Sequence, residues 1–154
     1  MKKILNIAVL LLLLISVTSC LKSGLDDLPA YDEAKITNIH FEYRWYDDSE
    51  GAKQLRVQTL NVEKTIDDES SVVTCKITVP GTSAVFTESI RNKVSLSSIA
   101  CYVDMSTAAR LKPLNNAPVL GEMRDFSAKE FNYLITAANG DEREWTIKIT
   151  DFIK

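Results

Sequence analysis

The sequence predicts an all-β domain in which two antiparallel sheets of about seven short strands pack face to face through Greek-key connections. Three observations lead to this fold class: apolar and polar residues alternate with period two, polar or Gly/Pro turns separate the alternating runs, and no long amphipathic helix pattern occurs. A single open sheet would leave one apolar face bare. A small barrel is the alternative architecture.

The first predicted strand begins near residue 36. Ile39, Phe41, Tyr43 and Trp45 are expected to face the core. They alternate with the outward residues His40, Glu42, Arg44 and Tyr46. An acidic turn over residues 47–51 ends the strand.

The second predicted strand covers residues 55–65, with Leu55, Val57, Leu60 and Val62 as its inward candidates. The apolar positions change from odd to even numbers, which predicts a β-bulge near Thr59. A third strand over residues 73–79 has the clearest alternation, and Pro80-Gly81 ends it.

The remainder is predicted as two connections, one more strand and a closing hairpin. Residues 82–93 form a loop with one helical turn around residues 87–91, residues 94–105 return to β structure, and residues 106–124 form an irregular connection. Strands around residues 131–135 and 145–149 then pair through a turn at Asn139-Gly140, because Asn-Gly accepts the positive φ angles of a tight reversal.

The first 19 residues have the pattern of a secretory signal peptide. Lys2 and Lys3 precede a run of roughly a dozen mostly apolar residues, which is too short for a comfortable transmembrane helix. Val17-Thr18-Ser19-Cys20 then resembles the lipobox of bacterial lipoproteins. That resemblance implies lipidation of Cys20 and cleavage before it, and several acyl chains hold a protein durably on a bilayer.

Cleavage leaves residues 20–32 as a lipidated cysteine with a flexible tether and residues 33–154 as one domain. Since Lys2 and Lys3 are removed, 16 basic residues stand against 21 acidic ones, and the mature net charge is −5. An acidic chain of this kind disfavours nucleic acid as a partner. Asp26 and Asp27 resemble the surface-export signal of lipoproteins in glycan-foraging Gram-negative bacteria, so an outer-membrane location is expected, on either its cell-surface or its periplasmic face.

Cys75 and Cys101 remain after Cys20 is assigned to the lipid. An exported chain can form disulfides, so one interpretation is a Cys75–Cys101 bridge. The other is two small buried side chains with free thiols.

The end of the chain resembles a known family. The segments Pro118-Val119-Leu120-Gly121, residues 131–140 and Trp145-Thr146-Ile147-Lys148-Ile149 are similar to the closing segment of immunoglobulin-like domains of unknown function in surface lipoproteins of glycan-foraging bacteria. The resemblance implies an immunoglobulin-like sandwich with a link to polysaccharide uptake. It carries no catalytic motif.

Motifs for catalysis, metals or cofactors do not stand out in the sequence. His40 is the single histidine and lies on the outward phase of the first strand, and no nucleophile elbow or phosphate-binding loop occurs. The pairs Asp47-Asp48 and Asp67-Asp68 lack the spacing of a calcium-binding EF-hand loop. We therefore expect no catalytic residue, no metal site and no cofactor, and a protein that is not an enzyme.

Trp45, Tyr46 and Asp47 form the one candidate ligand site. Sugar-binding sandwiches stack sugar rings on exposed aromatic residues beside a carboxylate, and these residue types adjoin at the end of the first strand. The competing interpretation is that Trp45 caps the core, since it shares the phase of Phe41 and Tyr43. The expected function is a non-catalytic, lipid-anchored module with a protein partner in an outer-membrane complex; the alternative is a glycan-binding module.

Overall fold

The computed structural model describes residues 30–48 and 51–154, and within them the chain forms a two-layer β-sandwich. The predicted signal peptide, Cys20 and most of the predicted tether lie outside these residues. Sheet A contains, in spatial order, β2 (Gln54–Thr59), β1 (Ile36–Asp47), β5 (Ile99–Met105) and β7 (Met123–Arg124). Sheet B contains β3 (Asn61–Asp67), β4 (Val72–Thr78), β9 (Glu142–Ile153), β8 (Glu130–Thr136) and β6 (Arg110–Pro113).

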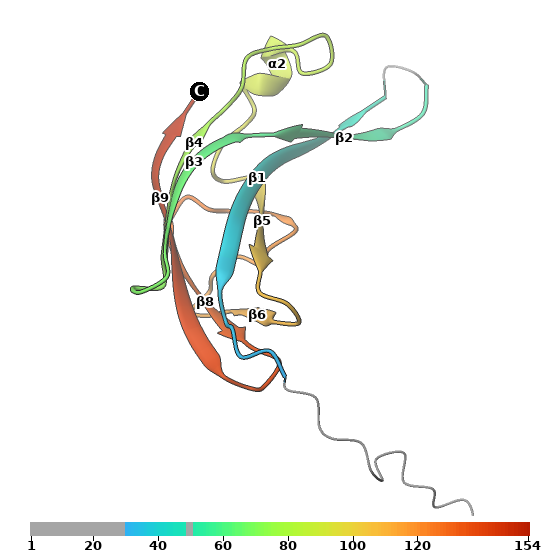
Figure 1. The fold of residues 1–154 in the computed structure, drawn as a ribbon. Helices are drawn as coiled ribbons and strands as arrows, with labels where there is room; N and C mark the ends of the chain where they lie inside the picture. Colours follow the sequence, from blue (N-terminus) through green and yellow to red (C-terminus); the bar gives the residue numbers. More distant parts are fainter. Residues whose placement is uncertain (1–29, 49–50) are drawn as a thin grey trace, which may run out of the picture.

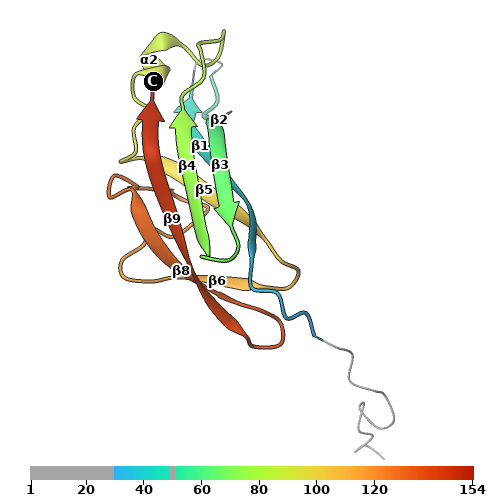
Figure 2. The ribbon, with the colours of Figure 1, turned by 60° about the vertical axis from the view of Figure 1, so that its left-hand side comes forward.

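The all-β prediction is confirmed, and the sheets add one feature to it. All strand pairs are antiparallel except β4–β9, which run parallel in the middle of sheet B. Figure 2 shows β4 and β9 side by side with β3 beyond β4. A short helix, α2 (Glu88–Arg91), lies where the sequence predicts a helical turn. The immunoglobulin-like assignment stays a prediction.

The core lies between the sheets and is built from the predicted inward phases. Ile39 and Phe41 of β1 are fully buried, as are Tyr133 and Ile135 of β8. Phe126, from the loop before β8, packs edge to face against Phe41 at 5.9 Å and Phe131 at 5.4 Å between ring centroids. Edge-to-face packing adds to the burial of these rings and joins the two sheets.

The closing hairpin forms as the sequence predicts. β8 pairs with β9 in a register that places Tyr133 opposite Trp145 and Phe131 opposite Ile147. Gly140 has φ +97°, and the Ala137 N–H donates to the Asp141 carbonyl at 2.8 Å to close the turn.

The prediction for residues 55–65 is wrong. These residues form two strands in different sheets, with β2 in sheet A and β3 in sheet B, and the buried Leu60 lies where the chain crosses between them. The even-numbered positions face inward in both strands, so the change of apolar positions near Thr59 is not a bulge. It arises because Leu55 and Val57 face solvent on β2, whereas Leu60 faces the core.

The connection over residues 106–124 contains more regular structure than predicted. β6 pairs with β8, and β7 adds two residues to the edge of β5. Pro113 occupies the end of an edge strand, a position that tolerates a residue without a backbone N–H.

Candidate functional site

The β1–β2 hairpin extends beyond the sandwich (Figure 1). It carries an exposed apolar face. Tyr46 pairs with Leu55, and Arg44 pairs with Val57. The exposed fractions are 63 % for Tyr46, 55 % for Leu55 and 50 % for Val57. We call these three side chains the hairpin face.

The hairpin face lies far from the place where the described chain begins. Residue 30 lies near the start of β1, and the hairpin lies at its other end (Figure 1). Any attachment through the N-terminal segment would therefore act at the opposite end of β1 from the hairpin face.

The three residues of the predicted glycan site do not converge. Trp45 points to the other side of β1 from Tyr46, is half-buried, and packs against Tyr43 at 6.0 Å and Phe86 at 5.8 Å between ring centroids. Asp47 forms an ion pair with Arg56 at 3.4 Å, from its Oδ2 to the guanidinium Nε. Trp45 thus caps the rim of the core, and only Tyr46 remains as an exposed ring.

Lys53 covers part of that exposed ring. Its ammonium nitrogen lies 4.2 Å from the centroid of Tyr46, within the range of a cation–π interaction. A sugar that stacked on this face of the ring would have to displace the lysine.

A polar region borders the hairpin face on β1 and β5. The rings of His40 and Tyr102 stack with centroids 4.7 Å apart, and His40 Nε2 lies 3.1 Å from Asp104 Oδ2. The hydrogen bond to His40 lowers the pKa of Asp104. Arg44 forms an ion pair with Glu42 and donates to the Gly121 carbonyl at 2.7 Å, which fixes the loop before β7 against sheet A.

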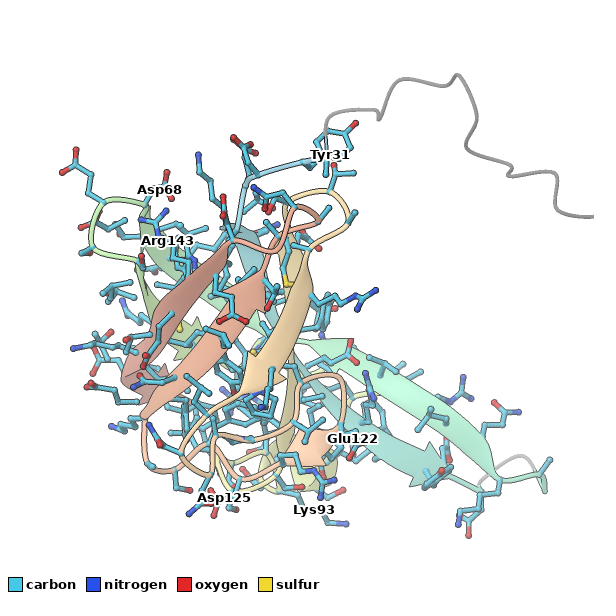
Figure 3. All side chains as sticks on the ribbon, turned by 90° about the horizontal axis from the view of Figure 1, so that it is seen from below. Tyr31, Asp68, Lys93, Glu122, Asp125 and Arg143 are labelled. Carbon is cyan, nitrogen blue, oxygen red and sulfur yellow. The ribbon has the colours of Figure 1, made fainter. Side chains whose placement is uncertain are left out.

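A second polar cluster lies where the described chain enters the sandwich. Arg143 of β9 donates to Asp68 Oδ1 at 2.8 Å and to Ser71 Oγ at 2.6 Å, and Figure 3 shows Arg143 and Asp68 on adjacent segments. Lys35 pairs with Asp68 at 3.2 Å and with Glu33 at 3.3 Å, and hydrogen bonds to these two carboxylates raise its pKa. The positive charges of Lys35 and Arg143 are balanced by the carboxylates of Glu33 and Asp68. The cluster therefore holds the start of β1 against sheet B.

Cys75 and Cys101 lie in facing sheets, on β4 and β5, and both are buried with free thiols. The bridge that the sequence left open is therefore not formed in this structure. Burial raises the pKa of Cys75 to about 12 and raises that of Cys101 well above its ordinary value. Both behave as small apolar core residues with little thiolate.

The second acidic pair that the sequence singled out, Asp67-Asp68, has structural partners. Asp67 accepts hydrogen bonds from the Ser70 hydroxyl at 2.7 Å and from the backbone N–H groups of Glu69 and Ser70, which lowers its pKa and stabilises the β3–β4 turn. Asp68 pairs with Arg143. Across residues 30–48 and 51–154, no group of three or more potential metal ligands converges.

Sequence reasoning missed the hairpin face because it placed Leu55 and Val57 in the core. The apolar pattern gives no signal for it, because the core-facing positions of β2 are the polar Gln54, Arg56 and Gln58, whereas its apolar residues face outward. No helix in the described part of the chain is both long and apolar enough to cross a membrane.

Comparison with known proteins gives a family and a related structure. The chain is similar to BF4250 of Bacteroides fragilis NCTC 9343, a protein described as secreted, whose crystal structure is known at 1.81 Å resolution. The two share 38 % sequence identity over 82 % of this chain and 100 % of that chain, with a TM-score of 0.74. No match was found among proteins of curated function. The profile of the DUF5018-related family matches residues 36–148, which is most of the chain, and the protein therefore belongs to the DUF5018-related family.

Proposed function

We propose that this protein is a lipid-anchored outer-membrane protein whose sandwich is a non-catalytic contact module. The lipobox resemblance at Cys20 and the similarity to a protein described as secreted support a place in the envelope. The module takes part in an outer-membrane assembly linked to polysaccharide uptake, as the resemblance to domains of surface lipoproteins implies.

The hairpin face is the observation that carries the contact role. Tyr46, Leu55 and Val57 are each at least half exposed and lie together on paired strands. Apolar side chains gathered on one exposed face favour protein contact, whereas scattered ones do not. Attachment through the segment before residue 30 would act at the end of β1 opposite the hairpin face.

The anchor is tested with wild-type protein and the Cys20→Ala variant. Mass spectrometry of the wild-type protein should show an acyl-modified Cys20 as the first residue, and the protein should fractionate with outer membranes. The variant should carry no acyl mass and should leave the membrane fraction. A variant that stays membrane-bound without acyl mass would refute the anchor.

The contact role is tested by photocrosslinking in intact cells. A benzoylphenylalanine at position 55 should form a covalent adduct with a neighbouring protein when the cells are irradiated. The same replacement of Thr65, which is exposed on the edge strand of sheet B, is the matched control and should give no adduct. Absence of any adduct from position 55 would refute the contact role.

The link to polysaccharides has a separate test. Deletion of the gene should slow growth on a polysaccharide whose uptake needs the assembly and leave growth on its constituent monosaccharide unchanged. Equal growth of deletion and parent strains on every polysaccharide tried would refute this link.

A further inference from the structure

The edge of strand β2 lacks the protection that the other sheet edges of the described chain have. Sheet A ends at β2 and β7, and sheet B ends at β3 and β6. β7 has only two residues, and β6 carries Arg110, Lys112 and Pro113. Short strands, basic side chains and proline are the devices by which proteins prevent pairing at an edge.

The edge strand of sheet B carries a lysine, a residue that disfavours pairing at an edge. Lys64 of β3 is exposed, lies opposite Cys75, and its ammonium group donates to Asn38 Oδ1 and the Ile39 carbonyl of β1. β2 has one charged residue, Arg56, which lies opposite Trp45 and forms an ion pair with Asp47 of β1.

The backbone groups on the outer edge of β2 belong to Leu55, Val57 and Thr59. The Leu60 N–H donates to the Phe41 carbonyl at 2.9 Å, and the register of the hairpin continues from that pair. In an antiparallel ladder, alternate residues bond to the partner strand and the intervening residues direct their N–H and C=O groups to the other side. Gln54, Arg56 and Gln58 therefore bond toward β1, and the intervening three point away from it.

These outward backbone groups lie on the same residues as the exposed apolar side chains. Leu55 and Val57 have outward-directed backbone groups on the edge of β2, and their side chains are two of the three that form the hairpin face. A partner strand that paired with β2 would satisfy the backbone and cover the apolar side chains in one step.

The residues of β2 are compatible with pairing to β2 of a second copy. A two-fold axis at Val57 places Val57 opposite itself, Leu55 opposite Thr59, and Arg56 opposite Gln58. The competing register of equal overlap, with the axis at Arg56, would place two like charges directly opposite each other, which is destabilising. Charge thus selects the register centred on Val57.

We propose that two copies of this protein associate through antiparallel pairing of their β2 edges about Val57, so that sheet A continues across both molecules. The pairing is closed by its two-fold symmetry, so it gives a dimer rather than a fibre. This inference rests on the proposed contact role of the hairpin face and names its partner.

The test is site-specific disulfide formation by the full chain in membranes of intact cells, after mild oxidation. Residues opposite each other as a hydrogen-bonded pair have Cα atoms about 5.5 Å apart, within the range of about 4.4–6.8 Å that a disulfide spans. Val57→Cys should therefore give a disulfide-linked band at twice the mass of the chain. Leu55→Cys is the matched control, because the two copies of that residue are offset by about 14 Å along the strands and should not be linked.

Two further variants test the same surface without a new cysteine. When two differently tagged copies are expressed together, one should co-purify with the other. Val57→Lys should abolish this co-purification, because it places two cations at the two-fold axis. Val119→Lys, at an exposed valine in the loop before β7, should leave it unchanged.

The outcomes separate the two proposals. If Val57→Cys forms no more dimer than Leu55→Cys, or Val57→Lys still co-purifies, the self-pairing is refuted. If position 55 also forms no photoadduct, the contact role fails as well. A photoadduct between position 55 and a different protein, with no dimer from Val57→Cys, would overturn the self-pairing and leave the contact role standing.

Discussion

Replacement of Trp145 by phenylalanine should destabilise the sandwich strongly. Trp145 is fully buried, and its indole Nε1–H donates to the Ala34 carbonyl at 2.9 Å. Phenylalanine would leave that buried carbonyl without its donor, which costs about 1–3 kcal/mol. The smaller ring adds about 1–2 kcal/mol for lost contacts and the space left behind. We expect the free energy of unfolding to fall by about 2–5 kcal/mol, a large share of the 5–15 kcal/mol typical of a domain.

Trp45→Phe is the matched control for this prediction. Trp45 is half-buried, and its ring packs against Tyr43 and Phe86. Its replacement should cost about 1 kcal/mol. Urea denaturation followed by circular dichroism measures both variants, because the midpoint falls with stability while the slope stays constant in a two-state transition. Equal destabilisation by the two replacements would show that the hydrogen bond to Ala34 contributes nothing.

Three other predictions address the thiols, the closing turn and the glycan interpretation. Because the pKa of Cys75 is raised from 9.0 to about 12, the folded protein keeps a proton that the unfolded chain loses. The contribution of Cys75 to the free energy of unfolding should then be fully present below pH 9 and should fall by about 1.4 kcal/mol per pH unit as the pH rises from 9 toward 12. Chemical denaturation across that range measures the fall, and Cys75→Ala should reduce its slope; an unchanged slope would contradict the assignment. Gly140→Ala should cost about 1–3 kcal/mol, because its φ of +97° strains any residue with a Cβ, whereas Gly81→Ala should be nearly neutral in thermal unfolding; equal effects would contradict this account. Soluble polysaccharides should leave tryptophan fluorescence unchanged, because Trp145 is buried and Trp45 packs against Phe86; saturable quenching would favour the glycan-binding alternative.

The parts of the fold that the sequence predicts correctly are those in which one strand keeps one phase. Apolar side chains occupy every second residue over residues 39–45 of β1, in β4 and β8, and over residues 145–149 of β9, and each run stays within one sheet. Residues 54–67 break this condition, because β2 and β3 are nearly contiguous in sequence but belong to different sheets. Periodicity gives the spacing of faces along a chain but does not say which face is inside. The exposure of Leu55 and Val57 therefore could not be predicted from their pattern alone.

The candidate site also shows what periodicity can and cannot predict. The phase of Trp45 correctly suggests that it belongs with Phe41 and Tyr43, and the structure packs it at the rim of the core. The hairpin face, in contrast, depends on pairing between Tyr46 and Leu55, which follows from the register. The parallel pairing of β4 with β9 could not be predicted from local sequence patterns either, because it joins residues about 75 positions apart.

That parallel pair determines when the molecule can fold. β9 lies between β4 and β8 in sheet B, so a chain that ends before residue 142 has two separate fragments, β3–β4 and β8–β6, in place of one sheet. Contacts between distant residues form late and slowly. A ribosome or a translocation channel must therefore release nearly the whole chain before the sandwich closes. The delay postpones folding until the last strand is available. For a protein with a predicted secretory signal, it would keep the polypeptide unfolded during export.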